Sequence, residues 1–395
     1  MNNRKLRIGI VLSSVPAYSE TFFQTKIDGL LERGFDVILF AKGKKDGLNA
    51  KVITPYPVLG FRPAMFIVLP VVLSLTLLKS PRVFFKYVKL LRYGGMNFIQ
   101  VVERVYLGAH ILPYDLDWLH FGFITQAIGK EKLAKAIGAK MAVSIRGFDI
   151  SVFPLMNPGK LDNVWSFLDK LHTISGNLLA VAKEFGLPDS VRVQKISPAI
   201  DVAKFISQKD MFFENFNEVN LITVARLDWK KGLEYALEAC LLLKNSGIQF
   251  KYTIVGEGGE REKLTYLIHQ MGLRNEVSIT GRLNQAEIIP LLHKHDVYLQ
   301  PSIEEGFCNA VLEAQASGLL CIVSDAGGLS ENVIDTRTGW VVPKRDSVLL
   351  AKKIRDVLKM EKSELERIRN QTMKRIEDEF SLQQHIKSWI RFYSS

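Results

Sequence analysis

The feature that most constrains the fold is a series of short apolar segments, each followed by a stretch of helical length. Segment 6–12 is followed by a helix-like stretch at 19–33, and Gly34 closes that stretch before the next apolar segment, 36–41. Apolar runs of this length, separated by helices, are typical of parallel strands that are covered on both faces. The chain therefore begins as a β-α-β unit of a doubly wound sheet.

The same alternation occurs twice along the chain. Since 395 residues suffice for two domains of about 150–200 residues each, we predict an α/β protein with two Rossmann-like doubly wound domains that face each other across a cleft. The further strand-like segments lie at 118–121, 141–145, 171–174 and 191–196 in the first half, and at 221–225, 252–255, 277–280, 297–300 and 320–324 in the second.

Positive charge is concentrated in the first half. Residues 1–200 contain 26 Lys and Arg against 14 Asp and Glu, a net charge of 26 − 14 = +12, whereas residues 201–395 contain 26 against 27, a net charge of −1. This imbalance predicts an anionic partner for the first half alone. Three dispersed cysteines and an N-terminal apolar run that is broken by Arg7 favour a reducing compartment and argue against a signal peptide. We expect the protein in the cytoplasm.

One stretch of the first half, 47–102, contains no acidic residue. Its apolar part, 64–78, has 15 residues with Pro70 inside and is shorter than the roughly 20 that a membrane-spanning helix needs. Basic helices with Phe, Tyr and Leu lie in the membrane interface, where anionic lipids attract Lys and Arg. We expect the insertion at about 59–95 to attach the protein to the inner face of the cell membrane; the alternative is a helical insertion packed on the domain with a solvated basic face. The basic residues are Arg62, Lys79, Arg82, Lys86, Lys89 and Arg92.

Two glutamates eight residues apart form the most informative local pattern. Glu305 follows the strand-like segment 297–300 on a turn that contains Gly306, and Glu313 lies inside the next helix-like stretch, 307–317. Ligands of open α/β sheets bind outside the carboxyl ends of the strands. Carboxylates there accept hydrogen bonds from hydroxyl groups, and the N-terminus of the helix, near Gly306 to Cys308, attracts an anion. The pattern suits a ligand with both hydroxyls and phosphate.

A second turn carries two cations. Arg226 and Lys231 follow the strand-like segment 221–225 and precede a helix, which is a suitable clamp for a diphosphate; the alternative is a basic surface turn. The glycine turns at Gly256 and at 327–328 allow close backbone approach, but any sharp turn uses glycine.

In the first half, His120 and Arg146 each end a strand-like segment. In isolation, His120 fits a core histidine better than a cleft residue, and Arg146 faces the cleft or pairs with Asp149. The Asp115-Leu116-Asp117 sequence resembles a metal–nucleotide motif, but it precedes a strand, so we interpret it as a loop cap. No other spacing in the chain suits metal ligands.

Taken together, these motifs resemble the retaining family 4 glycosyltransferases of the GT-B fold over nearly the full length of the chain. The main matches are the Glu305-x7-Glu313 signature and Arg226-x4-Lys231-Gly232. The branch that makes bacterial exopolysaccharides such as colanic acid is indicated by 19–22, His120-Phe121-Gly122, 146–150 and 200–205. Three positions depart from the family: Cys308 stands where Gly or Ser is common, Arg146 replaces His, and 13–19 lacks paired glycines.

The resemblance implies a role for each of these residues. Glu313 would bind the ribose of a nucleotide-diphosphate sugar and Glu305 the hydroxyls of the donor sugar, while Arg226 and Lys231 would neutralise the diphosphate. His120 would lie at the reacting centre, which reverses the interpretation as a core residue. The other expected donor-binding residues are Gly256, Gly281, Arg282, Leu283, Gly306, Phe307 and Cys308, and the expected acceptor-side residues are Ser19, Glu20, Arg146 and Asp149.

The family also implies an organisation and a reaction. An acceptor-side domain, 1–200, a linker, 201–218, and a nucleotide-sugar-binding domain, 219–375, would be followed by a C-terminal helix, 376–395, that crosses back to the first domain. The enzyme would transfer a sugar to a lipid-linked acceptor with retention of configuration, in the biosynthesis of cell-surface polysaccharide, without a metal or another cofactor and without nucleic acid. The alternatives are a catalytically silent scaffold subunit of a polysaccharide assembly complex and a nucleotide-sugar epimerase.

Overall fold

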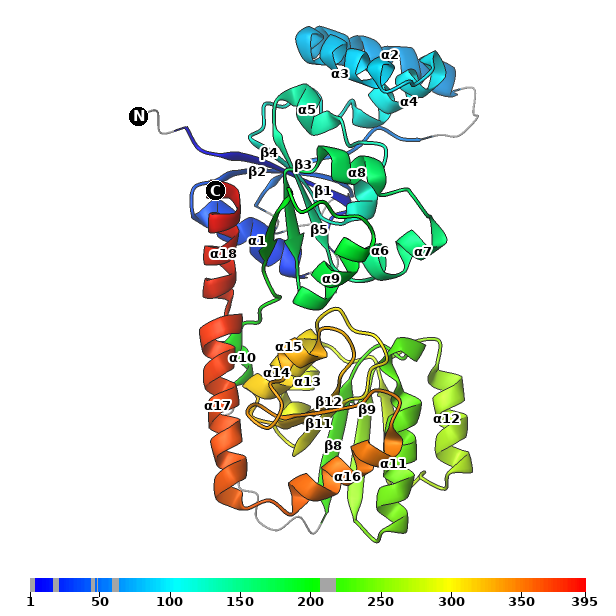
Figure 1. Cartoon of the computed structure of the whole chain (residues 1–395), viewed down its shortest axis with the longest axis vertical. Coiled ribbons are helices and arrows are strands. Elements are labelled where there is room, and N and C mark those ends of the chain that lie inside the picture. Colours follow the sequence, from blue (N-terminus) through cyan, green and yellow to red (C-terminus); the bar gives the residue numbers. More distant parts are fainter. Residues whose placement is uncertain (1–3, 17–20, 44–46, 48, 59–63, 207–217) are drawn as a thin grey trace. The chain divides into compact units, whose positions relative to one another are not determined.

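The computed structural model describes residues 4–16, 21–43, 47, 49–58, 64–206 and 218–395. It divides the chain into two compact units (Figure 1): residues 1–196 with 386–395, and residues 197–385. Each unit contains one parallel sheet with helices on both faces, as the alternation of apolar and amphipathic segments predicts. The prediction of two Rossmann-like α/β units is confirmed.

The sheet of the first unit has seven parallel strands in the order β3-β2-β1-β4-β5-β6-β7. Its central strands are buried on both faces, which explains their nearly continuous apolar sequences. The short edge strand β3 is absent from the sequence prediction. The strands are β1 (Arg7–Ser14), β2 (Asp36–Lys42), β3 (Lys51–Ile53), β4 (Trp118–Phe121), β5 (Lys140–Ile145), β6 (Lys170–Thr173) and β7 (Arg192–Lys195).

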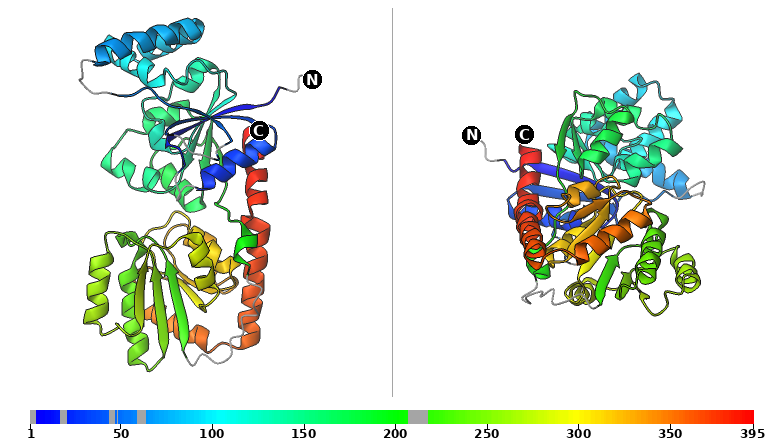
Figure 2. Two further views of the ribbon diagram at one scale, coloured as in Figure 1. Left: turned by 180° about the vertical axis from the view of Figure 1, so that it is seen from behind. Right: turned by 60° about the horizontal axis from the view of Figure 1, so that its bottom comes forward.

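One face of this sheet is covered by α1 (Thr21–Glu32) and by the end of the C-terminal helix α18 (Leu382–Ser394), which lie side by side in Figures 1 and 2. Phe23 and Ile27 of α1 share a buried apolar cluster with Trp389 and Phe392 of α18. Gly29 allows this close contact, because a Cβ there would lie 2.5 Å from Cδ1 of Ile386 and would force that side chain to move. The last residues of the chain are therefore part of the core of the first unit.

Three helices, α2 (Ala64–Lys79), α3 (Pro81–Tyr93) and α4 (Phe98–Gly108), are inserted between β3 and β4. A small apolar cluster that includes Val72 and Tyr106 joins α2 to α4, and the helices lie outside the sheet in both figures. In the described part of the chain no single helix is long and apolar enough to cross a bilayer; α2 from Met65 and α3 meet that test only as a pair bent by 117°.

The sheet of the second unit has six parallel strands in the order β10-β9-β8-β11-β12-β13. The strands are β8 (Val219–Val224), β9 (Phe250–Val255), β10 (Val277–Gly281), β11 (Val297–Gln300), β12 (Leu320–Ser324) and β13 (Trp340–Val342). The covering helices include α11 (Leu233–Asn245), α12 (Arg261–Gln270), α13 (Gln285–Leu292), α14 (Asn309–Ala316), α15 (Leu329–Asn332), α16 (Ser347–Leu358) and α17 (Lys362–Phe380).

The unit boundaries differ from the predicted ones. The chain leaves the first unit after Ile196 and returns at Ile386, rather than at 200 and 376. Ile200 pairs with Ser381, and Phe205 in α10 (Val202–Phe205) is buried in the second unit. Part of the predicted linker is thus structure of the second unit, and α17 belongs to that unit throughout. Residues 207–217 lie outside the described residues.

Candidate functional site

The candidate site lies where the strand order of the second sheet reverses. From β8 the chain continues to β9 and β10 on one side, whereas β11, β12 and β13 follow on the other side. Because all the strands are parallel, their carboxyl ends share one edge of the sheet, and ligands of such sheets bind at the point of reversal. The turns after β8 and β11 carry Lys231 and Glu305, so the topology brings together two charged residues that are 74 positions apart.

Lys231 and Glu305 form a hydrogen-bonded ion pair where these two turns meet. We call the meeting point of the turns 226–232 and 301–308 the crevice. Only 15% of the Lys231 side chain and 13% of the Glu305 side chain are exposed. Burial is the largest single influence and lowers the pKa of Lys231, but the charge and hydrogen bond of Glu305, with a contribution from Cys308, together place that pKa above its ordinary value. Lys231 therefore carries a positive charge. Its ammonium group has three N–H donors, more than the hydrogen bond to Glu305 uses.

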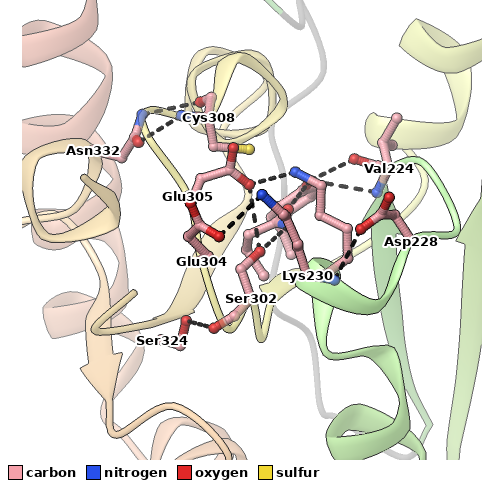
Figure 3. A network of polar contacts seen from close by, with 12 residues as sticks. Val224, Asp228, Lys230, Ser302, Glu304, Glu305, Cys308, Ser324 and Asn332 are labelled. Carbon is pink, nitrogen blue, oxygen red and sulfur yellow. Dashed lines mark hydrogen bonds and ion pairs between the residues drawn. The ribbon is translucent and has the colours of Figure 1, made fainter. Parts of the chain in front are cut away.

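The neighbouring residues repeat this arrangement closer to solvent. Lys230 pairs with Glu304 at 3.0 Å, and the carbonyl of Lys230 accepts a hydrogen bond from the N–H of Ile303 at 2.7 Å. Figure 3 shows how these contacts join the turn after β8 to the turn after β11. Arg226 is exposed on the same turn, and repulsion from its positive charge lowers the pKa of Lys231. The crevice therefore carries an excess of positive charge on the β8 side.

Two glycines allow the turns to approach each other. Gly232 has φ 58°, and a Cβ there would lie 2.3 Å from the carbonyl oxygen of Pro301. Gly256, after β9, has φ 153°, and a Cβ there would lie 1.8 Å from the carbonyl oxygen of Ala225. Any other residue would push the backbone apart, so the Lys-Gly and Val-Gly sequences after β8 and β9 are geometric requirements of the crevice.

The turn from Gly306 to Cys308 leads into α14. The N–H of Cys308 donates to Oδ1 of Asn332 at 3.0 Å, and Nδ2 of Asn332 donates to the carbonyl of Cys308 at 3.0 Å. This corrects the expectation that the N–H of Cys308 is free for an anion; those of Gly306 and Phe307 remain the candidates. The Phe307 ring is buried against Phe380, so only its backbone can serve a ligand.

The thiol of Cys308 faces the same charges. Burial, and next the Glu305 carboxylate, raise its pKa to about 12, so the side chain is a neutral thiol near pH 7. Sequence reasoning did not find Asn332, which is fully buried. Its position four residues after the glycine turn at 327–328 was the available signal.

Glu313 lies one helical turn inside α14 and is partly buried. Burial raises the pKa of its carboxyl to about 7, and a hydrogen bond from Gln285 opposes that shift. Gly281 ends β10 and pairs with Gly256, which places Arg282 and Leu283 at the same edge of the sheet, on the far side of β9. The predicted donor-binding residues thus share one edge of one sheet.

His120 does not fit its predicted place. It lies within β4, is fully buried, and its ring packs against Trp389 and Phe392 of α18. Its Nε2 lies 2.8 Å from Oγ of Ser144, and its Nδ1 lies 2.6 Å from the hydroxyl of Tyr393. Both ring nitrogens therefore have partners inside the first unit, and the prediction that His120 lies at the reacting centre is wrong. The interpretation as a core histidine agrees with the structure.

The acceptor-side predictions concern the turn after β5 and two residues before α1. Asp149 is buried, and its Oδ1 accepts from the N–H groups of Arg146 at 3.0 Å and Gly147 at 2.8 Å. Burial raises the pKa of this carboxyl, and the hydrogen bonds from its own turn oppose the shift. The Arg146 guanidinium lies 4.0 Å from the centre of the Phe22 ring. Both residues shape the turn after β5; an acceptor role stays a prediction. Ser19 and Glu20 lie outside the described residues.

The basic insertion presents its charges to solvent. Lys79, Arg82, Lys86, Lys89 and Arg92 are all exposed, whereas Arg62 lies outside the described residues. Large apolar side chains are exposed beside them, including Phe66 at 77% and Phe98 at 74%. Of the 21 large apolar residues that are exposed in the described structure, nine lie between 66 and 99: Phe66, Ile67, Val71, Leu75, Leu78, Phe85, Tyr93, Phe98 and Ile99.

The described residues include no group of three or more His, Cys, Asp or Glu side chains that could hold a metal ion. The Asp115-Leu116-Asp117 sequence has other partners. Asp115 pairs with Arg4 at 2.9 Å and Arg7 at 3.0 Å, and Asp117 accepts from the N–H of Arg7 at 2.8 Å. These contacts attach the first strand to the loop before β4.

Comparison with known proteins agrees with this geometry. Residues 204–375, which carry every candidate donor-site residue, match the family described as glycosyl transferases group 1. The chain is 26% identical to the putative colanic acid biosynthesis glycosyltransferase WcaL of Escherichia coli (strain K12), over 96% of this chain and 97% of that protein. It is also 26% identical to the amylovoran biosynthesis glycosyltransferase AmsK of Erwinia amylovora, over 85% and 86%.

Residues 204–375 therefore form a domain of the glycosyl transferases group 1 family, and the chain has the GT-B fold. Among solved structures, the sucrose-phosphate synthase of Thermosynechococcus elongatus superposes with a TM-score of 0.73 at 16% identity, over 99% of this chain and 98% of that one. Anabaena Alr3699/HepE, which was solved in complex with UDP, superposes with a TM-score of 0.72 at 14% identity, over 98% and 99%. At these identities the likeness concerns the fold. The family assignment places the Lys231–Glu305 crevice in the domain that the family has in common.

Proposed function

We propose that this glycosyltransferase moves a sugar from a nucleoside-diphosphate sugar to a lipid-linked acceptor, with retention of anomeric configuration, in the biosynthesis of an exopolysaccharide. The observation that carries the proposal is the buried Lys231–Glu305 pair at the strand-order reversal, with Arg226 beside it. A cation and a carboxylate side by side suit a donor that has a diphosphate next to a hydroxylated sugar. The names of WcaL and AmsK support the polymer class, and the UDP complex of HepE supports the donor class.

The main catalytic requirement of this transfer reaction is stabilisation of the leaving group. As the glycosidic bond breaks, negative charge develops on the nucleoside diphosphate. Lys231, Arg226 and the N-terminal turn of α14 supply preorganised positive charge there, and removal of one such group typically costs about 10²–10³-fold in rate. In the proposed reaction the leaving phosphate takes the proton of the acceptor hydroxyl on the same face of the sugar, and neither a metal nor a protein nucleophile takes part.

Glu305 then has a binding role. Its carboxylate accepts hydrogen bonds from donor-sugar hydroxyls while it holds Lys231 in place. Glu313 binds the ribose from inside α14, the helix that follows the Glu305 turn. This division of roles suits an ion pair that is already formed without donor, because Lys231 needs no reorganisation when the diphosphate arrives.

The test is transfer with a panel of donors. Purified protein is incubated with bacterial membranes and radiolabelled nucleotide sugars, one donor at a time, and label is measured in the lipid extract. We expect one donor to label lipid and the anomeric signal of the product to match that of the donor. Label in no fraction, from any donor that the protein binds, would favour a binding subunit over an enzyme.

The acceptor class rests on the insertion between β3 and β4. Nine exposed apolar side chains and five exposed cations share α2, α3 and the start of α4, and residues 47–102 contain no acidic group to repel an anionic surface. Apolar side chains enter the interface and cations attract anionic headgroups. A peripheral contact with the inner face of the membrane is the partner that suits both features.

The membrane contact has a matched control within the chain. Lys86→Ala/Lys89→Ala removes two cations of the insertion, whereas Lys352→Ala/Lys374→Ala removes two cations exposed on α16 and α17. Since each Lys near an anionic surface contributes about 1 kcal/mol, we expect the first variant to bind phosphatidylglycerol vesicles roughly 10- to 30-fold more weakly. The second variant should bind like the wild type. Equal binding by all three proteins, or strong binding to purely zwitterionic vesicles, would contradict an electrostatic contact.

A further inference from the structure

A buried clamp joins α17 to the turn that carries Glu305. Asn332 at the end of α15 holds the backbone of Cys308 by two hydrogen bonds of 3.0 Å, as Figure 3 shows. The side chain of Asn332 therefore pairs with the backbone of Cys308 through one donor and one acceptor, as the backbone of a neighbouring strand would. This fixes the residue at which the site turn becomes α14.

Asn332 is held in turn by α17. Arg375 donates to the carbonyl of Asn332 from one terminal nitrogen and to the carbonyl of Glu331 from the other, both at 2.8 Å. Its Nε lies 3.0 Å from the carboxylate of Glu379. Only 14% of the side chain is exposed, and the guanidinium lies 5.0 Å from the centre of the Phe380 ring. A fork of this kind fixes the two carbonyls in orientation as well as distance.

Two further contacts act on the same turn. The N–H of Gly328 donates to the carbonyl of Glu305 at 2.8 Å, and Phe380 packs on Phe307 at 5.7 Å between ring centres. The turn from Glu305 to Cys308 is therefore held at three points: at its first residue by Gly328, at Phe307 by the end of α17, and at Cys308 by Asn332. None of these groups needs to touch a donor.

We propose that Asn332 and Arg375 are positioning residues that set the turn 305–308 for the donor diphosphate and sugar. The proposal rests on the proposed function of this crevice as the donor site. Its physical basis is the orientation of three groups: the N–H groups of Gly306 and Phe307 and the Glu305 carboxylate. These groups point toward a ligand only if Asn332 and Arg375 keep the backbone of the turn in place. Displacements of about 1 Å in such a support weaken binding and transfer without removal of any group that contacts the ligand.

The test compares Asn332→Asp and Arg375→Met with Arg367→Met. Asn332→Asp keeps the size of the side chain but sets an acceptor against the Cys308 carbonyl. Arg375→Met keeps most of the apolar stem of the side chain and removes the two hydrogen bonds of the guanidinium. It leaves the buried Asn332 unchanged. Arg367→Met removes an exposed cation elsewhere on α17. The full chain is titrated with UDP and with GDP by calorimetry, and its urea unfolding is followed in parallel.

We expect the nucleotide affinity of the first two variants to fall roughly 5- to 30-fold, which corresponds to coupling through a packed network. Where a transfer assay is available, KM for the donor should rise while KM for the acceptor stays constant. Arg367→Met should equal the wild type in each measurement. A lower urea midpoint with unchanged nucleotide affinity in both Asn332→Asp and Arg375→Met would overturn the proposal, because a purely structural clamp gives that result.

Failure of the proposed function gives a different result. If the wild type binds neither UDP nor GDP, the crevice is not a donor site for these nucleotides, and the positioning role falls with it. If the wild type binds one of them and both clamp variants bind it equally well, only the clamp is rejected.

Discussion

At the scale of single residues, the site depends on charges whose burial is matched by a partner. Lys231 would lose its proton more readily in the crevice if Glu305 were absent, because burial alone lowers its pKa. The carboxylate reverses that effect. No ion pair with Glu313 is found among the described residues, and burial raises the pKa of its carboxyl to about 7. Glu313 therefore titrates near neutral pH, although the spacing of the two glutamates in the sequence gives no hint of it.

This difference predicts that nucleotide affinity depends on pH through Glu313. Ribose hydroxyls donate to a carboxylate, so binding favours the ionised form and affinity rises as pH increases through 7. For a free pKa of about 7, we expect up to a tenfold gain in affinity between pH 6 and pH 8. Calorimetric titration at both pH values measures it. Glu313→Gln cannot ionise and should reduce the gain to what the phosphates of the nucleotide contribute; an unchanged gain in that variant would contradict the ribose role.

The residues that sequence reasoning identified are those whose partners lie in short motifs. Lys231 and Glu305 each follow a recognisable strand, and parallel strands must end at one edge. His120 was misplaced because the resemblance outweighed its burial, and the burial depends on a helix that begins more than 250 residues later. Arg375 was missed because a basic residue in a polar helix normally indicates a solvated face; its carbonyl partners lie more than 40 positions away.

At the scale of elements, α18 is held to the first sheet by an ordered chain of hydrogen bonds. His172 Nε2 lies 3.0 Å from the carbonyl of Ile196, which can only accept, so the proton of that ring is on Nε2. With a single proton on each ring, Ser144 donates to His172 Nδ1 and accepts from His120 Nε2, each at 2.8 Å. His120 Nδ1 then accepts from the Tyr393 hydroxyl at 2.6 Å. All four ring nitrogens have a partner in this arrangement.

Lys26 of α1 adds a second buried base to the same contact. Its Nζ lies 3.4 Å from His120 Nδ1 and 3.5 Å from the centre of the Trp389 ring. Burial, with Arg146 as a further cause, lowers the pKa of Lys26 well below its ordinary value. Burial also lowers the pKa of His120, assisted by Lys26, His172 and Arg146. The packing of α18 on the first sheet therefore favours the uncharged forms of Lys26 and His120.

The stability of the first unit should consequently increase with pH. Between its lowered folded pKa and its ordinary value, each buried base binds more protons in the unfolded chain, so unfolding becomes less favourable as pH rises. The gain ends near the ordinary pKa, about 6.5 for His120 and about 10.4 for Lys26. One such group changes the free energy of unfolding by at most about 1.4 kcal/mol per pH unit.

Lys26→Met isolates the contribution of the lysine. We expect the variant to melt higher than the wild type at pH 7, because it removes an ionisable group without a carboxylate partner from the core. Above pH 7 its stability should depend less on pH. Differential scanning calorimetry at pH 6, 7.5 and 9 decides this. A variant that melts lower than the wild type at every pH would show that Lys26 stabilises the contact.

At the scale of the whole molecule, the two proposed functions, membrane contact and donor binding, belong to separate parts of the chain. The excess positive charge and the exposed apolar helices belong to residues 1–200, and the donor-site residues belong to the second unit. The repeated alternation of strands and helices sufficed to predict two α/β units, because parallel strands that are buried on both faces have a distinctive sequence. The boundaries were not predictable, since the pairing of Ile200 with Ser381 joins segments about 180 residues apart.

This separation predicts that the two activities can be lost independently. Lys86→Ala/Lys89→Ala should bind nucleotide like the wild type while it binds anionic vesicles weakly. Lys231→Met should bind vesicles like the wild type while nucleotide affinity falls. Vesicle cosedimentation and nucleotide titration on the same preparations measure both. Loss of both activities in either variant would show that the two parts of the chain depend on each other.

The most direct test of the central claim compares two adjacent lysines. Lys231 pairs with Glu305 in the crevice, whereas Lys230 pairs with Glu304 nearer to solvent. The rate of sugar transfer at saturating donor is measured for Lys231→Met and Lys230→Met, with melting temperatures as a check on folding. We predict a loss of about 10²–10³-fold for Lys231→Met and a change within about threefold for Lys230→Met, because an ion pair that is partly open to solvent contributes little. Equal rates in the two folded variants would contradict the assignment of Lys231 to the donor diphosphate.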